Sequence, residues 1–183
     1  MESHFSQLFL AAKFAARKHH GQFRKGADVE PYIVHPLEVA HLLSTVGGVD
    51  DPDILIAAIL HDTIEDTKTS EEDITCTFGE RVCSIVVEVT DDRELPKQRR
   101  KELQEEHAPH LSHEAKQLKM CDKISNIADI LDNPPEDWDL ERKIEYVNWG
   151  ERVFKGLRGA NDRLERHFDE LVERARRELG ANI

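Results

Sequence analysis

The nine residues ILHDTIEDT, numbered 59–67, place one histidine and three carboxylates directly after an apolar run. If this stretch is helical, residues four apart share a face, so His61 lies with Glu65 and Asp62 lies with Asp66. Imidazole nitrogens and carboxylate oxygens bind divalent ions, and carboxylates also accept protons. The stretch therefore indicates either a site that binds a cation and moves protons, or a helix end that surfaces into water.

Two further residues could complete a metal site, which usually needs three or more protein ligands and an open position. His35 stands in PYIVHP at a helix start, and Asp122 stands in LKMCDKISN, in apolar surroundings. Because a buried charge is disfavoured unless it is paired or bound to metal, Asp122 is not expected to be idle. Each residue alone also fits a structural or exposed role, but the order His…His-Asp…Asp is a metal-binding arrangement.

Helical patterns must position these residues, because they account for almost the whole chain. The first pattern places apolar residues at helical spacing, namely Phe5, Leu8, Phe9, Ala12 and Ala16. Alternation with a period of two residues is nowhere sustained, so we predict an all-α, single-domain helical bundle of roughly eight to ten helices over residues 1–183. We expect helices over residues 5–20, 36–46, 52–64, 70–79, 80–90, 97–108, 112–131, 140–157 and 161–179.

The composition excludes several classes of partner. A formal net charge of −12 over 183 residues argues against general binding of nucleic acid or acidic membranes. No apolar run approaches the ~20 residues that a membrane-spanning helix needs, and residues 1–20 do not resemble a signal peptide. The three cysteines form no CxxC pair, which favours reduced thiols in the cytoplasm. We therefore predict a cytoplasmic protein without a nucleic-acid or membrane partner.

The order of the motifs resembles a known family. His35, His61-Asp62 and Asp122 match the H…HD…D pattern of HD-domain metal phosphohydrolases. FAARKHHGQFRKGADVEPYIVHPLEVA, AAILHDTIEDT and KMCDKISNI are similar to the guanosine tetraphosphate (ppGpp) hydrolase domain of RelA/SpoT proteins, especially the small stand-alone hydrolases of animals. The likeness continues through FGERVCSIVVEVTDDRELPK and YVNWGERVFKGLRGAN, so it covers nearly the whole chain.

The resemblance implies hydrolysis of the 3′-pyrophosphate of ppGpp or pppGpp, giving GDP or GTP and pyrophosphate. At this length we expect a hydrolase without the synthetase and regulatory domains of the full-length proteins. The resemblance makes His35, His61, Asp62 and Asp122 the ligands of one divalent ion, normally manganese. Two imidazoles and two carboxylates also suit Zn, Fe or Co, so the residue types alone leave the metal open.

The resemblance also makes Glu65 and Asp66 the catalytic pair, which we interpret as handling protons and positioning water. Their crowding with Asp62 should raise the pKa of one carboxyl group unless a metal ion offsets it. Ala128 stands where the family commonly has Arg, so one substrate or structural contact is lost or replaced there. The anionic substrate needs basic and aromatic contacts, for which the candidates are Arg24, Lys25, Tyr32, Lys97, Asn126 and Tyr146.

Two alternatives stay open. The first keeps the chemistry and changes the substrate, as in removal of the 2′-phosphate of NADPH or hydrolysis of another nucleotide. The second is a non-catalytic module that binds the alarmone, against which the intact ligand set and the Glu65–Asp66 pair argue. The amphipathic segment 161–179 is expected to pack on the bundle, although a homodimer contact through it also stays open.

Overall fold

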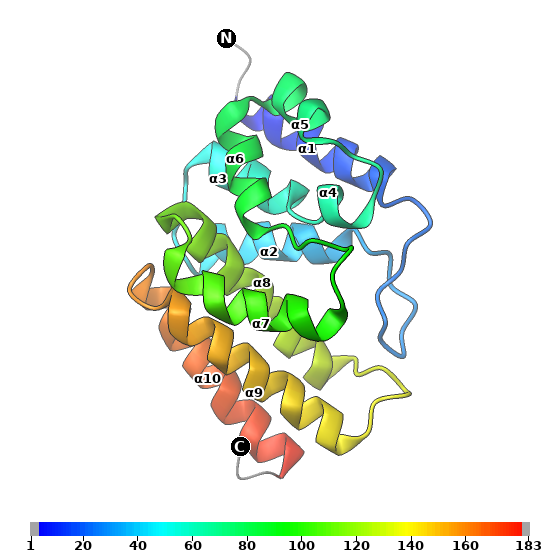
Figure 1. Cartoon of the computed structure of the whole chain (residues 1–183), viewed down its shortest axis with the longest axis vertical. Coiled ribbons are helices and arrows are strands. Elements are labelled where there is room, and N and C mark those ends of the chain that lie inside the picture. Colours follow the sequence, from blue (N-terminus) through cyan, green and yellow to red (C-terminus); the bar gives the residue numbers. More distant parts are fainter. Residues whose placement is uncertain (1–3, 181–183) are drawn as a thin grey trace.

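The computed structural model describes residues 4–180, which form ten α-helices and one 3-10 helix (Figure 1). No β-strand occurs in this part of the chain, apart from an isolated bridge between Phe23 and Pro31. The predicted all-α fold is therefore confirmed. The helices are α1 (His4–Lys18), α2 (Val34–Thr45), α3 (Pro52–Leu60), α4 (Thr63–Asp66), α5 (Glu71–Phe78), α6 (Glu80–Val89), α7 (Lys97–His107), η1 (Ala108–His110), α8 (His113–Asp132), α9 (Leu140–Leu157) and α10 (Asp162–Leu179).

Helix α8 is the central element of the bundle. It packs against α2, α3, α6, α9 and α10, and α1 and α5 lie toward one end of the molecule (Figure 1). The Ser112 hydroxyl caps its start by accepting a hydrogen bond from the Ala115 amide. Most side chains of α8 from Leu118 to Ser125 are fully buried, and so the middle of this helix lies inside the protein.

The predicted continuous helix over residues 52–64 is wrong, because the chain turns between α3 and α4. Pro52 occupies the first turn of α3, and the carboxylate of Asp51 caps that helix, as its sequence indicates. The helix stops at Leu60, whose carbonyl accepts a hydrogen bond of 2.6 Å from the Thr63 hydroxyl. Such a side-chain bond to the backbone competes with the helical pattern. The residues between, His61 and Asp62, therefore occupy a turn.

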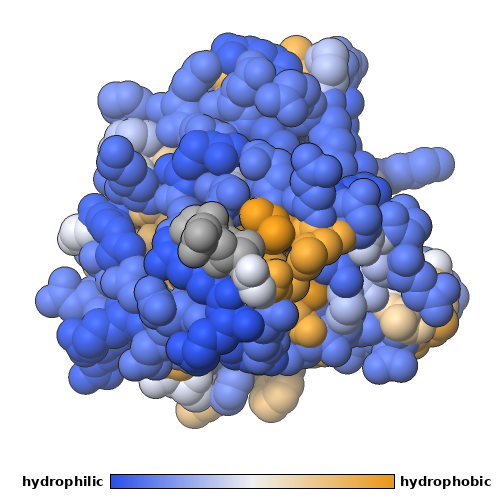
Figure 2. All heavy atoms as spheres, turned by 90° about the horizontal axis from the view of Figure 1, so that it is seen from below, coloured by the Kyte–Doolittle hydropathy of each residue, from blue (hydrophilic) through white to orange (hydrophobic). Residues whose placement is uncertain are grey.

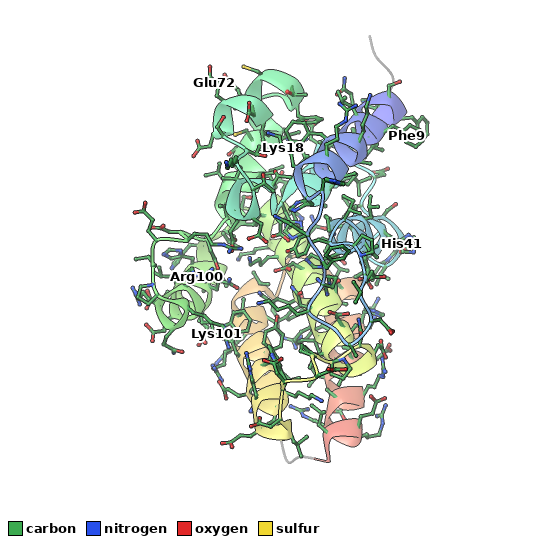
Figure 3. The ribbon with its side chains drawn as sticks, turned by 90° about the vertical axis from the view of Figure 1, so that its right-hand side faces the viewer. Phe9, Lys18, His41, Glu72, Arg100 and Lys101 are labelled. Carbon is green, nitrogen blue, oxygen red and sulfur yellow. The ribbon has the colours of Figure 1, made fainter. Side chains whose placement is uncertain are left out.

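Helix α1 exists as predicted, but the apolar residues at its helical spacing do not all face the core. Phe5 and Phe9 are 74% and 75% exposed, and Figure 3 shows Phe9 pointing away from the bundle. Its fully buried residues are Ala11 and Ala15. Small alanine side chains let α1 lie close to the apolar helix α3, and this close packing decides which face is buried.

Helix α10 packs on the bundle, as expected for its amphipathic sequence. It lies against α8 and α9, and it buries Leu164, Phe168, Leu171, Val172 and Ala175. Seen from the end at which α10 finishes, the molecular surface is mostly hydrophilic, with one apolar patch near the centre (Figure 2). Within residues 4–180 no helix is both long enough and apolar enough to cross a bilayer.

Candidate active site

The four predicted metal ligands come from three parts of the chain and meet at one place. His35 lies at the start of α2, His61 and Asp62 lie in the turn after α3, and Asp122 lies in mid-α8. The Nε2 atom of His35 is 3.4 Å from Asp122 Oδ1 and 3.7 Å from Asp62 Oδ2. The Nε2 atom of His61 is 3.2 Å from Asp62 Oδ1 and 3.9 Å from Asp122 Oδ1.

One ring nitrogen of His61 forms a hydrogen bond and the other has no hydrogen-bond partner. Its Nδ1 lies 2.8 Å from the carbonyl oxygen of Ala58 and must donate to it, so in the neutral imidazole Nε2 carries the lone pair. Nε2 is buried and has no hydrogen-bond partner, which costs about 1–3 kcal/mol for such a group. Potential ligand atoms of His35, His61 and Asp62 all lie within 4.8 Å of one another. The bare nitrogen and the converging carboxylates fit a divalent cation.

Asp122 is an ionised carboxylate inside the protein. Burial would raise its pKa, but the ammonium groups of Lys123 and Lys119 hold the pKa well below its usual range. Their Nζ atoms lie 3.4 Å and 3.6 Å from Asp122 Oδ2. Asn126, predicted to contact substrate, donates a hydrogen bond of 2.5 Å to Asp122 Oδ1. Its neighbours therefore keep the Asp122 carboxylate charged and fix its orientation.

Glu65 and Asp66 lie in α4, just after the ligand turn, and basic groups hold them. Glu65 accepts hydrogen bonds from the Asp91 amide at 3.1 Å and from Arg93 Nε at 3.2 Å. Arg100 of α7 donates a hydrogen bond of 3.5 Å to Glu65, and the carboxylate of Asp66 pairs with Arg93. Sequence reading did not find these partners, because the loop and helix that carry them meet α4 only in the folded chain.

The pKa of the Glu65 carboxyl is raised, mainly by burial. The charge of Asp91 raises it further, and Asp62 contributes less. The prediction that crowding with Asp62 raises one carboxyl pKa is thus right in direction, but burial is the larger cause. A carboxylate whose pKa lies closer to neutrality is better suited to take up a proton.

Five of the six predicted substrate contacts line one pocket of about 260 Å³. The pocket adjoins the cluster of metal-ligand candidates, because Tyr32 lines the pocket and contacts Asp62. Its hydroxyl donates a hydrogen bond of 2.6 Å to Asp62 Oδ2. The pocket is lined by Phe23, Arg24, Lys25, Tyr32, Lys97, Asp129, Ile130, Pro135, Trp138 and Tyr146.

Cations and aromatic rings gather at this pocket. Phe23 and Trp138 in its lining and Arg142 beside Trp138 were not predicted from the sequence. Partial burial lowers the pKa of Lys97, and the charges of Arg142 and Lys25 lower it further. The rings of Trp138 and Tyr146 lie 5.4 Å apart, and the Arg142 guanidinium lies 4.3 Å from the Trp138 ring. Arg142 precedes Tyr146 by four residues on α9, so helical spacing could have found it.

Arg24 has a fixed partner across the pocket. Its Nη2 atom donates a hydrogen bond of 2.8 Å to Asp129 Oδ2, and only 8% of its side chain is exposed. Ala128, which stands where the family commonly has Arg, lines a different groove together with Asp129, Glu38 and other acidic residues. Ala128 therefore supplies no positive charge to the groove or to the pocket, both of which Asp129 lines.

A third buried histidine, His19, lies beside His35 and His61, and the sequence analysis gave it no role at the site. His19 is 3% exposed and its ring lies 4.9 Å from that of Tyr32. Its Nδ1 lies 2.7 Å from Gln22 Oε1, and Gln22 Nε2 donates 2.8 Å to the Asp66 carbonyl. These contacts tie the loop after α1 to α4.

Comparisons with known proteins identify the family. The HD domain family matches residues 11–149. Guanosine-3′,5′-bis(diphosphate) 3′-pyrophosphohydrolase MESH1 of Xenopus tropicalis is 50% identical over 171 residues, 93% of this chain and 96% of the relative. The chain belongs to the HD-domain family and, within it, to the MESH1 group.

Two further comparisons extend the family match to the whole fold. MESH1 of Homo sapiens is 46% identical over 173 residues, which cover 94% of this chain and 97% of the human protein. A solved structure of a metazoan orthologue of SpoT, which hydrolyses ppGpp and plays a role in starvation responses, is 40% identical. It superposes with a TM-score of 0.91, covering 96% of this chain and 97% of that one. The family predicted from the motifs is confirmed.

The Arg24–Asp129 pair can be tested by stability. Asp129→Ala leaves a nearly buried guanidinium without its partner, and we expect a loss of about 1–3 kcal/mol in the free energy of unfolding, measured by urea denaturation. The control is Asp132→Ala on the same helix, which removes an ion pair with the more exposed Arg174 and should cost about 0–1 kcal/mol. Equal losses in the two variants would contradict the buried pair.

Proposed function

We propose that this chain hydrolyses the 3′-pyrophosphate of ppGpp or pppGpp, releasing pyrophosphate and GDP or GTP. The observation that carries the proposal is the position of Tyr32. It lines the cationic pocket and its hydroxyl binds Asp62, so a nucleotide in the pocket can present a phosphate to the ligand cluster. The MESH1 relatives bear the name of this activity. We also propose that the chain acts in the cytoplasm, where its three free cysteines stay reduced.

In this proposal His35, His61, Asp62 and Asp122 hold one divalent ion, and Mn²⁺ is the proposed metal. When bound, such an ion supplies Lewis acidity, which polarises a phosphoryl oxygen and acidifies the attacking water. The support from this chain is the grouping of His35, His61 and Asp62, with the Asp122 carboxylate 3.4 Å from His35 Nε2. The buried Nε2 of His61, which has no hydrogen-bond partner, supports it further.

Glu65 is the proposed general base. Its carboxylate takes a proton from water, whose oxygen then forms a bond to the phosphorus attached to the 3′ oxygen. The bond between that phosphorus and the 3′ oxygen breaks, and the leaving 3′ oxygen takes up a proton to become a hydroxyl group. Arg93 contacts both Glu65 and Asp66 and holds the two carboxylates in one orientation. Asp66 orients the water in this scheme.

The pocket provides the contacts that an anionic nucleotide needs. Lys25 and Lys97 in the pocket lining supply positive charge for phosphates, and Arg142 beside Trp138 adds to it. The rings of Trp138 and Tyr146 supply an apolar face for a purine base. These contacts suit any purine nucleotide with an extra phosphate on its ribose, so NADPH is the substrate to compare with ppGpp.

A substrate panel tests the activity. The Mn²⁺-loaded protein is incubated with ppGpp, pppGpp, NADPH, GTP and ADP, and the products are identified by anion-exchange chromatography. We expect pyrophosphate and a guanosine 5′-nucleotide from ppGpp or pppGpp, because those substrates carry the 3′-diphosphate. Absence of pyrophosphate from both alarmones overturns the proposal, and phosphate release from NADPH alone establishes the alternative.

Metal binding is tested by thermal unfolding of chelator-treated protein. At 100 times its dissociation constant, Mn²⁺ should add about 2.7 kcal/mol of stability, which raises Tm by roughly 5–10 °C in a chain of this size. Asp122→Asn should gain little, because a neutral amide replaces a charged ligand, and the exposed control Asp50→Asn should respond like the wild type. An equal rise for Asp122→Asn contradicts the assigned ligand.

The role of Glu65 predicts a pH dependence. Activity as a base requires an ionised Glu65, and the nearby charge of Asp91 raises the Glu65 pKa. Asp91→Asn removes that charge and keeps the backbone amide, so the Glu65 pKa falls. The acidic limb of kcat/KM against pH should move to lower pH, while the control Asp92→Asn leaves it in place. A limb that does not move, or moves to higher pH, contradicts Glu65 as the base.

A further inference from the structure

The two histidines of the ligand cluster are oriented by different means. The Nδ1 atom of His61 binds a backbone carbonyl, that of Ala58. The Nδ1 atom of His35 lies 3.0 Å from the hydroxyl oxygen of Ser125, and this hydroxyl donates a hydrogen bond of 2.7 Å to Glu38 Oε2. The side chain of His35 therefore depends on a chain of two further side chains.

The direction of these bonds fixes the proton on His35. A serine hydroxyl has one hydrogen, and a carboxylate can only accept, so the hydrogen of Ser125 belongs to the bond with Glu38. Ser125 Oγ must then accept the bond from His35, which places the imidazole proton on Nδ1. In the neutral imidazole, the Nε2 atom that faces Asp62 and Asp122 is then left with its lone pair.

The nearby carboxylates favour the other tautomer of His35, with the proton on Nε2, so another interaction must stabilise the proton on Nδ1. A proton on His35 Nε2 could donate to Asp122 Oδ1 at 3.4 Å or to Asp62 Oδ2 at 3.7 Å, and bonds to carboxylates are strong. That tautomer would occupy the nitrogen needed for a metal ion. Only an acceptor for the Nδ1 proton keeps Nε2 bare, and Ser125 is that acceptor.

We propose that Ser125 and Glu38 are positioning residues for the metal site, acting through the tautomer of His35. The inference rests on the proposed binding of a divalent ion and not on the identity of the substrate. Ser125 is 1% exposed, so water does not replace its hydroxyl easily. Glu38 is solvent-exposed and lines the acidic groove of α2 and α8, so it can be replaced without opening the core.

Hydrogen bonds of this kind to a ligating histidine are worth about 10–100-fold in metal affinity. We therefore expect Ser125→Ala to weaken Mn²⁺ binding about 10–100-fold in titration calorimetry, and Glu38→Ala to weaken it in the same direction. The matched control is Glu30→Ala, which removes a carboxylate from the same groove and should change the dissociation constant less than twofold. Circular dichroism verifies that each variant is folded.

The tautomer itself gives a readout that does not depend on metal or turnover. Histidine ¹⁵N spectra of the metal-free protein, taken at a pH where the imidazoles are neutral, should show His35 protonated on Nδ1 in the wild type. The proton should move to Nε2 in Ser125→Ala. The proposed positioning role of Ser125 is overturned if wild-type His35 is protonated on Nε2. It is also overturned if the Mn²⁺ affinity of Ser125→Ala is within twofold of the wild type.

The two proposals can fail separately. If the wild type binds Mn²⁺ but does not hydrolyse ppGpp or pppGpp, the proposed substrate is wrong. The Mn²⁺ affinities of the variants then still decide whether Ser125 and Glu38 position the metal site. If the wild type does not bind a divalent ion, the proposed metal site is wrong, and the ¹⁵N spectra of the metal-free protein still decide whether Ser125 sets the tautomer.

Discussion

The burial of the Asp122 charge is the constraint on which the rest of the structure depends. Moving a carboxylate into a protein costs several kcal/mol unless other charges compensate. Lys119 and Lys123 supply that compensation from the same helix, and His35 and His61 bring their nitrogens to its other side. Asp122 can therefore stay ionised in the middle of α8. A carboxylate in this state is ready to bind a cation without first losing a proton.

One face of α8 contributes to both the cluster of proposed metal ligands and the proposed nucleotide pocket. Residues 122, 125, 126 and 129 recur at the spacing of a single helix face. Asp122 faces the histidines, Ser125 receives the Nδ1 proton of His35, Asn126 donates to Asp122, and Asp129 holds Arg24. Because α8 packs against five other helices, its neighbours surround this face. The position of α8 thus sets three things: where Asp122 lies, how Ser125 orients His35, and where Asp129 meets Arg24 at the pocket wall.

The sequence predicts what depends on residue type and short spacing. The helical fold, the HD-domain family and a ligand cluster around Asp122 follow from such signals. The turn at His61 was missed, because it depends on a side-chain bond within the chain that competes with the helical pattern. Bonds between distant positions were missed as well. Glu38 and Ser125 are 87 residues apart and Arg24 and Asp129 are 105 apart, so only the packing of α8 brings them together.

In the proposed metal site, two histidines and two aspartates converge on one divalent ion. This arrangement is tested most directly by crystals grown with Mn²⁺ and measured on both sides of the manganese absorption edge. The account predicts one strong anomalous peak within bonding distance of Nε2 of His35 and His61 and of the carboxylates of Asp62 and Asp122. A peak elsewhere, or no peak at this site in saturating Mn²⁺, would contradict it.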